Sequence, residues 1–230
     1  MCIRDRFPYA ESPDDLCAAR REAGVEVVLF NMPPGDFAAG ERGLAALPDR
    51  RGDFRAALDQ TLDYARALDA GRCHVMAGVP GQDSDRAECL DVLTENFRLV
   101  ADRLQQAGVA GSVEALNRRD MPGYLLHNAA DAIAVLDRSG HPNLSFQYDF
   151  YHLQIEDGDL IQGLRRLLPR VGHIQFADNP GRHEPGTGEI NFPNVFAAVD
   201  AMGYDGWVGA EYLPTGRTED SFGWFPPASG

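Results

Sequence analysis

Four polar side chains interrupt or end apolar runs along the chain, and their types are those that bind cations and move protons. They are Glu114, Asp149, Gln175 and Glu211. Carboxylate and amide oxygens suit Mg²⁺ or Mn²⁺, with zinc as an alternative. A carboxylate also serves as a general base or acid at a carbon beside a carbonyl group. Any one of them alone is equally well explained as a helix cap or an arginine partner, so the functional interpretation depends on all four.

Histidine and arginine side chains lie beside the same segments. Three histidines lie on or just after apolar runs, two of them candidates for substrate binding. Arginines follow Glu114, and the glycine-rich stretch 181–189 adds an arginine and a histidine. Such groups pair with a substrate carboxylate or hydrogen-bond to substrate oxygens. The substrate-binding candidates are therefore His74, Arg119, His152, Arg182 and His183. A buried core histidine, a solvated ion pair and an ordinary turn-rich loop are the competing interpretations.

Short apolar or β-branched runs alternate with longer amphipathic segments. The predicted strands cover 25–30, 73–77, 112–116, 144–149, 173–176 and 207–211. The predicted helices cover 13–23, 53–69, 86–107, 128–139, 157–167 and 192–202, because apolar residues recur there at helical spacing. Asp53, Asn128 and Asn191 are the predicted N-caps. Strands separated by helices indicate βαβ units and a parallel sheet.

The spacing of the strands favours an α/β fold of the TIM (β/α)8-barrel type. Each step along the chain has room for one βα unit of roughly 30 residues. Active sites of such barrels lie at the carboxyl ends of the strands. The four polar residues lie at or near those ends, so we expect them to meet on one rim. No GxGxxG or Walker sequence opens a predicted helix, so no nucleotide cofactor is expected.

Composition narrows the class of protein further. The 230 residues, 44% of them hydrophobic, fit one globular domain. The formal net charge of −14 argues against a nucleic-acid partner, because such proteins carry a basic face. The sequence has no signal peptide and no apolar stretch long enough for a membrane helix, so no membrane partner is expected. Four scattered cysteines indicate a reducing compartment, and we expect a cytoplasmic protein.

Five motifs resemble those of the hydroxypyruvate isomerase family, which belongs to the xylose isomerase-like TIM barrels. They cover residues 30–36, 74–78, 119–124, 147–152 and 181–191. The resemblance runs from about Phe7 to the C-terminus, so we expect a single barrel domain over 7–225. Residues 1–6 match nothing and 226–230 form a tail. Because the family begins with a strand and a helix that this chain lacks, we expect a barrel that is incomplete at its N-terminus.

The resemblance also implies an activity and roles for the residues. The activity is the interconversion of hydroxypyruvate and 2-hydroxy-3-oxopropanoate (tartronate semialdehyde) through an enediolate. The family's proton donor and acceptor pair falls on Glu114 and Glu211, and its metal-site pattern falls on Glu114, Asp149, Gln175 and Glu211. Ala115 stands where the family usually has proline. The expected partner is a small hydroxy-oxo acid, and a homo-oligomer is compatible with the sequence.

Three other functions stay open at this point. An isomerase of a longer acid, such as 2-oxo-tetronate, or a ketose 3-epimerase would use the same chemistry in a pocket of different length. A relative of the AP endonucleases would need a histidine-rich trinuclear zinc site and a basic DNA-binding face. The third alternative is an inactive fragment that lacks the first strand and helix.

Overall fold

The structure is a computed structural model that describes residues 2–225, with the backbone alone for residues 2–5. Met1 and the predicted tail 226–230 lie outside the described residues. The chain divides into two compact units, Met1–Phe146 and Gln147–Gly230. Strand β5 begins in the first unit and ends in the second.

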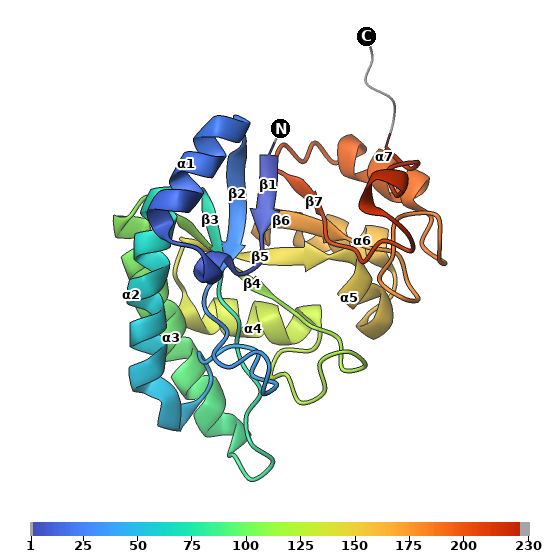
Figure 1. Cartoon of the computed structure of the whole chain (residues 1–230). Helices are drawn as coiled ribbons and strands as arrows, with labels where there is room; N and C mark the ends of the chain where they lie inside the picture. Colours follow the sequence, from blue (N-terminus) through green and yellow to red (C-terminus); the bar gives the residue numbers. More distant parts are fainter. Residues whose placement is uncertain (1, 226–230) are drawn as a thin grey trace. The chain divides into compact units, whose positions relative to one another are not determined.

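Strands and helices alternate along the described chain, as the sequence predicts (Figure 1). The strands are β1 (Cys2–Asp5), β2 (Glu26–Asn31), β3 (Arg72–His74), β4 (Ala110–Glu114), β5 (Leu144–Asp149), β6 (Val171–Phe176) and β7 (Val208–Ala210). The α-helices are α1 (Pro13–Ala23), α2 (Arg51–Leu68), α3 (Arg86–Gln106), α4 (Ala129–Ser139), α5 (Phe150–Glu156), α6 (Leu160–Leu167) and α7 (Phe192–Ala201). Short 3-10 helices cover Pro8–Ala10, Pro48–Arg50, Leu168–Arg170 and Thr218–Asp220. Within each unit, the order of the strands in the sheet follows the chain.

The first unit pairs its strands in parallel and covers them with long amphipathic helices. The pairs β1/β2, β2/β3 and β3/β4 are all parallel. Leu58 and Leu62 of α2 and Leu93 and Phe97 of α3 are buried, at the helical spacing that the sequence shows. Each such side chain contributes about 1.5–3 kcal/mol when it leaves water. In Figure 1 the two helices run side by side along the same side of this unit.

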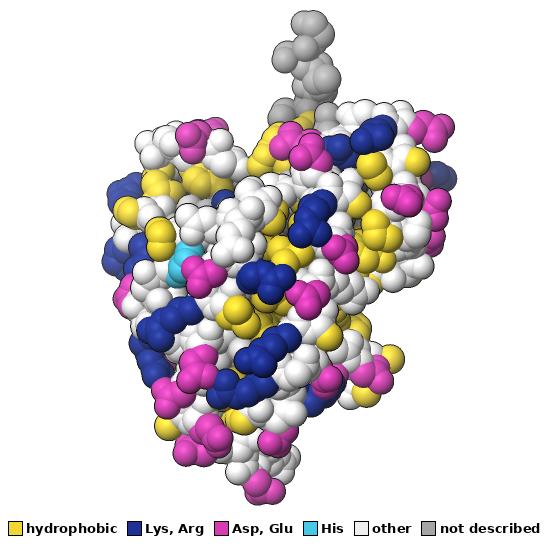
Figure 2. Space-filling model, turned by 90° about the vertical axis from the view of Figure 1, so that its left-hand side faces the viewer, with side chains coloured by type: hydrophobic (Ala, Val, Ile, Leu, Met, Phe, Trp, Pro, Cys, Tyr) yellow, Lys and Arg dark blue, Asp and Glu magenta, His cyan; other side chains and the backbone are white. Residues whose placement is uncertain are grey.

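The outward faces of α2 and α3 carry both signs of charge. Arg51 lies 2.6 Å from Glu95, and Arg103 lies 2.9 Å from Asp59, so ion pairs join the two helices. Figure 2 shows basic and acidic side chains interspersed over this face. Exposed pairs of this kind contribute about 0–1 kcal/mol each. None of the described helices combines the length and the apolar character needed to cross a bilayer.

The second unit has an aromatic core and includes the parallel strand pair of β6 and β7. Strands β6 and β7 pair in parallel, with Gln175 opposite Gly209 in the register. Ring contacts at centroid distances of 5.1–5.6 Å join Phe176 to Phe192, Phe196 and Trp224. Aromatic pairs of this geometry add about 0.5–1.5 kcal/mol each to the burial of their area. The cluster supports the end of β6, where Gln175 lies.

Two of the three predicted N-caps are found at the start of a helix. The side chains of Asn128 and Asn191 accept hydrogen bonds from backbone N–H groups three residues later, which confirms both predictions. The prediction for Asp53 is wrong, because the 3-10 turn Pro48–Arg50 runs directly into α2 and Arg50 takes the N-cap position. Asp53 lies in the first turn instead, where a negative charge is favoured by the helix dipole.

One strand and one α-helix of the described chain were not predicted from the sequence. Strand β1 is only four residues long and carries two charged residues, so it shows neither an apolar run nor alternation. Helix α5 starts immediately after β5, because Asp149 ends the strand and caps the helix. Residues 150–156 belong to neither the predicted strand 144–149 nor the predicted helix 157–167, because their aromatic side chains favour extended backbone and give no helical signal. The helix turns His152 back toward the end of its own strand.

Candidate active site

In the first unit, a buried carboxylate and a buried imidazole meet at the ends of neighbouring strands. Glu114 is the last residue of β4 and His74 the last residue of β3, and both are at least 97% buried. His74 lies opposite Ser112 in the register, and Glu114 follows two residues later on the same face. The distance from His74 Nδ1 to Glu114 Oε2 is 3.6 Å. Two of the predicted site residues are therefore brought together.

The segment after Glu114 is folded by hydrogen bonds from its own side chains. Asn117 Oδ1 accepts from the Asp120 N–H over 2.9 Å, and Tyr124 Oη accepts from the buried Ala77 N–H over 2.8 Å. Burial raises the pKa of the Tyr124 hydroxyl, so this phenol stays protonated. Arg119 lies on the exposed side of the turn. Its predicted role toward a substrate stays a prediction.

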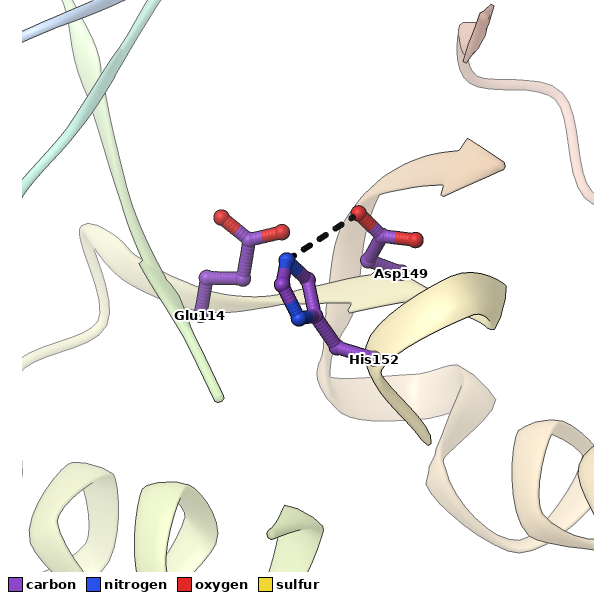
Figure 3. Close-up of side chains that lie close together, drawn as sticks. All are labelled: Glu114, Asp149 and His152. Atoms are coloured by element: carbon purple, nitrogen blue, oxygen red, sulfur yellow. Dashed lines mark ion pairs between the residues drawn. The ribbon is translucent and has the colours of Figure 1, made fainter. Parts of the chain in front are cut away.

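In the second unit, Asp149 has two functions at the end of β5. Its Oδ1 accepts from the Tyr151 N–H over 2.8 Å, which caps α5. Its Oδ2 lies 3.9 Å from His152 Nε2, an ion pair when the imidazole is protonated. Figure 3 draws both side chains with Glu114 and marks this pair with a dashed line. Cap and ion pair together fix the orientation of a carboxylate that is 99% buried.

Gln175 and Glu211 form a second polar pair in this unit. Gln175 Nε2 donates to Glu211 Oε2 over 2.5 Å, and the Glu211 N–H donates to the carbonyl of Phe176 over 3.0 Å. Gln147, which the sequence analysis did not single out, donates to Gln175 Oε1 from β5. The predicted ligand oxygen of Gln175 is therefore directed at Gln147. Cation binding through that oxygen requires the amide to turn over.

Arg182 bridges the two carboxylates of the second unit. Its Nη2 lies 3.1 Å from Glu211 Oε2 and 3.7 Å from Asp149 Oδ2. Its guanidinium carbon lies 5.2 Å from the centroid of the Tyr151 ring, within the range of a cation–π contact. The side chain is 15% exposed. The structure thus places this candidate for substrate binding against acidic groups of the protein itself.

The loop that carries Arg182 is organised by Asp178, a buried residue that sequence reasoning missed. Its two carboxylate oxygens accept four backbone N–H groups at 2.8–3.1 Å, from Asn179, Gly186, Gly188 and Ile190. A Cβ at Gly188 would lie 2.2 Å from the carbonyl oxygen of Asn179, so only glycine fits. The available signal was an aspartate at the start of a glycine-rich loop, since such residues accept from nearby backbone.

A second set of hydrogen bonds ties this loop to the segment after Glu211. The Leu213 N–H donates to the Arg182 carbonyl over 2.7 Å, and His183 Nδ1 donates to the Leu213 carbonyl over 2.6 Å. Thr215 donates to both oxygens of Glu184 and lowers the pKa of that carboxyl. His183 is thus engaged by backbone, and its predicted substrate contact stays a prediction. The paired segments hold Arg182 and Glu211 at a fixed separation.

The donor types of these groups fit a hard divalent cation. Glu114, Asp149 and Glu211 offer carboxylate oxygens, the ligands that Mg²⁺ and Mn²⁺ prefer, and Gln175 offers an amide oxygen. His152 adds an imidazole nitrogen beside Asp149. Arg182 supplies a positive charge to two of the same carboxylates. Carboxylates of this kind also transfer protons at carbon when a substrate carbonyl lies beside them.

Comparison with known proteins identifies the class. Residues 1–228 match the family model described as "Xylose isomerase-like TIM barrel", and the chain belongs to this family. This result confirms the barrel fold and the resemblance inferred from the sequence motifs.

Three similar proteins define the group more narrowly. The chain is 45% identical to "2-oxo-tetronate isomerase" of Cupriavidus necator, over 97% of this chain and 86% of the relative. It is 46% identical to "Putative hydroxypyruvate isomerase" of Homo sapiens, over 95% of this chain and 81% of the relative. A crystal structure of an "AP endonuclease, family 2" from Brucella melitensis matches with a TM-score of 0.95 and 42% identity, over 99% of this chain and 88% of that one. With relatives named as isomerases, the chain is an enzyme of the isomerase type.

Proposed function

We propose that the protein interconverts hydroxypyruvate and 2-hydroxy-3-oxopropanoate through an enediolate. The observation that carries this proposal is the position of Glu114, Asp149 and Glu211. All three carboxylates end a strand or directly follow one, and each has a polar partner within its own unit. In a barrel of this family, strand ends are where chemistry occurs. Relatives at 45–46% identity are named for isomerisation of short oxo acids.

The reaction moves one hydrogen between adjacent carbons. A carboxylate oxygen of Glu211 takes a proton from C3 of hydroxypyruvate, and the electron pair of that C–H bond forms the C2–C3 double bond of the enediolate. A proton is then delivered to C2, and the hydroxyl proton passes from O3 to O2, so that the aldehyde forms at C3. Glu114 is the second proton carrier in this proposal. Atoms and charge balance without an external oxidant or reductant.

The neighbours of Glu211 give its carboxylate a defined direction. Gln175 and Arg182 both reach Oε2, and the Glu211 N–H is held by β6. A proton carrier must point at one substrate carbon, because proton transfer depends on distance and alignment. Two donors on one oxygen restrict rotation of the carboxylate. This arrangement supports Glu211 as the base, with Gln175 as its positioning residue as long as the amide keeps this orientation.

A divalent cation, Mg²⁺ or Mn²⁺ in first choice, belongs to the same proposal. Glu114, Asp149, Gln175 and Glu211 would hold it, and it would supply Lewis-acid polarisation of the substrate carbonyl. A glutamate that binds a cation tightly is a weaker base. One of Glu114 and Glu211 can therefore contribute more to cation binding and the other more to proton transfer. His74 and His152 would hydrogen-bond to substrate oxygens. Removal of divalent ions with EDTA should lower turnover, and Mg²⁺ or Mn²⁺ should restore it.

Substrate length separates the main proposal from its alternatives. The enzyme should be assayed with hydroxypyruvate, with 2-oxo-tetronate and with a ketose such as D-fructose. We expect kcat/KM for an acid to exceed that for the ketose by about tenfold or more, since a charge-assisted hydrogen bond contributes about 1.5–3 kcal/mol. A higher kcat/KM for 2-oxo-tetronate than for hydroxypyruvate would assign the protein as a 2-oxo-tetronate isomerase instead. No conversion of either acid by folded protein, with or without divalent ions, overturns the proposal.

The similar Brucella melitensis structure is named as an AP endonuclease, which gives a second candidate function. A nuclease would bind DNA through a basic surface. The net charge is −14, and the face of α2 and α3 in Figure 2 mixes both signs. Titration of the protein with DNA that contains an abasic site, at low salt, separates the two candidates. Binding with cleavage supports the nuclease, and its absence leaves the isomerase.

A further inference from the structure

We propose that Arg182 is a tethered cation that competes with the divalent ion for Asp149 and Glu211. When the ion binds, the guanidinium is displaced and becomes the receptor for the substrate carboxylate. This inference rests on the proposed function, because it takes the divalent ion and the acid substrate from it. It gives Arg182 two successive partners, first the acidic groups of the protein and then the substrate.

The competition follows from the atoms that Arg182 contacts. Its Nη2 lies 3.1 Å from Glu211 Oε2 and 3.7 Å from Asp149 Oδ2. A hard cation binds carboxylate oxygens at about 2.0–2.6 Å. A cation on these two oxygens would therefore lie beside Nη2, where like charges repel strongly in a site that is mostly shielded from water. The guanidinium and the divalent ion therefore compete for these two oxygens.

The side chain of Arg182 can move while its backbone stays in place. The backbone has a φ of +59° and is held by the Leu213 N–H, so the loop fixes where the side chain begins. Asp178 fixes the same loop through four backbone N–H groups. The guanidinium carbon already lies 5.2 Å from the centroid of the Tyr151 ring, a contact that uses neither Asp149 nor Glu211. Displacement is therefore a side-chain rotation rather than an opening of the loop.

The released guanidinium suits the substrate. Arginine binds a carboxylate through two parallel hydrogen bonds, which the hydroxy-oxo acids provide and a neutral ketose does not. Binding of the ion and of the acid should then be positively coupled, since each favours the displaced position of Arg182. Without the ion, Asp149 and Glu211 keep the guanidinium and the acid binds weakly.

The test measures Mn²⁺ binding directly, by the loss of the free-ion electron paramagnetic resonance signal, on metal-free full-length protein. The dissociation constant for Mn²⁺ should fall about tenfold or more in R182Q, because this variant removes the positive charge that competes for Asp149 and Glu211. R182K keeps the charge and should stay near the wild type. R217Q is the matched control, because Arg217 is 75% exposed and pairs only with Glu219 among the described residues. It removes the same charge and should leave Mn²⁺ binding unchanged.

A second titration tests the coupling with D-glycerate, a three-carbon hydroxy acid without a carbonyl to isomerise. In the wild type, glycerate should tighten Mn²⁺ binding by a factor of about 5 or more. In R182Q this effect should disappear, while R217Q retains it. Circular dichroism establishes that each variant is folded.

Two results would overturn the inference. One is equal Mn²⁺ affinity in R182Q and wild type. The other is the absence of Mn²⁺ binding at millimolar concentration in every variant. In either case, turnover of hydroxypyruvate by the wild type, assayed with and without added divalent ions, shows that the isomerase proposal stands without this inference. Normal Mn²⁺ binding and coupling without any turnover would remove the isomerase proposal alone.

Discussion

The side-chain amide of Gln175 donates to Glu211 over 2.5 Å and so joins the interior of β6 to the residue that follows β7. The register of the two strands makes this contact possible, because Gln175 lies opposite Gly209 and Glu211 follows two residues later on the same face. Gly209 has no side chain to block the approach. The direction of the proposed base is thus set by a fully buried neighbour.

Replacement of Glu211 by glutamine should remove a proton carrier and leave the fold intact. Glutamine has the same shape and can still accept from Gln175, but it cannot take a proton from carbon. We expect kcat for hydroxypyruvate to fall by about 10²–10⁴. The matched control is Glu219→Gln on the exposed 3-10 helix, which should be fully active. Near-normal turnover by Glu211→Gln would exclude Glu211 as the base.

Replacement of Gln175 by leucine should lower both stability and activity. The variant leaves Glu211 without its amide donor and Gln147 without its acceptor. A buried polar group that loses its partner costs about 1–3 kcal/mol, so the free energy of unfolding in urea should fall by that amount. The control Gln154→Leu removes an amide that bonds to Glu189 at the surface, and it should change stability by less than about 0.5 kcal/mol. Equal stability of the two variants would contradict this account of the pair.

The periodicity of the sequence predicts most of the elements that position the site. Helix α1 and strand β5 occupy the predicted ranges, because a Ser12 cap and a run bounded by polar residues are strong local signals. Helix α5 was missed because aromatic residues after Asp149 favour a strand locally, whereas the cap at Asp149 decides for a helix. At this point the preference of the aromatic residues for extended backbone is weaker than the effect of the Asp149 cap, and a helix forms.

The types of the site residues were readable from the sequence, but their partners were not. Asp149, Gln175 and Glu211 drew attention because they are polar at the ends of apolar runs. That Arg182 faces Asp149 and Glu211 depends on the return path of the loop 178–190. That path is set by Asp178, whose four backbone donors lie between one and twelve residues further along the chain. Long-range pairing of this kind leaves no periodic signal.

Replacement of Asp178 by asparagine should loosen the loop that carries Arg182. One of the two accepting oxygens becomes an NH₂ group, so at least two backbone donors lose their acceptor. An unsatisfied donor costs about 1–3 kcal/mol where it is buried and less at the surface, and the amides of this loop should exchange faster with solvent. Because the backbone of Arg182 is then held less firmly, its side chain binds the substrate less well. KM for hydroxypyruvate should therefore rise more than kcat falls.

Hydrogen exchange read by mass spectrometry on the peptide 178–190 measures this loosening. Asp200→Asn on the exposed face of α7 is the control, since it removes the same charge outside the loop. Unchanged exchange in the peptide would show that the carboxylate of Asp178 does not hold the loop. A fall in kcat alone, with KM constant, would show that the loop serves the chemical step rather than substrate binding.

Replacement of Thr215 by valine should raise the pKa of the Glu184 carboxyl toward its ordinary value. Hydrogen bonds from Thr215 are the main cause of the lowered pKa, and the hydroxyl supplies the larger share. Because the pKa is lower in the folded state, the link stabilises the loop above the ordinary carboxyl pKa and is lost as pH falls through the lowered value. Carbon-13 NMR titration of labelled glutamate carboxyls measures the shift.

Thr187→Val is the control, because Thr187 donates to the backbone carbonyl of Glu184 and should leave the carboxyl pKa unchanged. Identical titration of Glu184 in the Thr215 variant and the wild type would show that this hydroxyl does not tie the loop to the segment after Glu211.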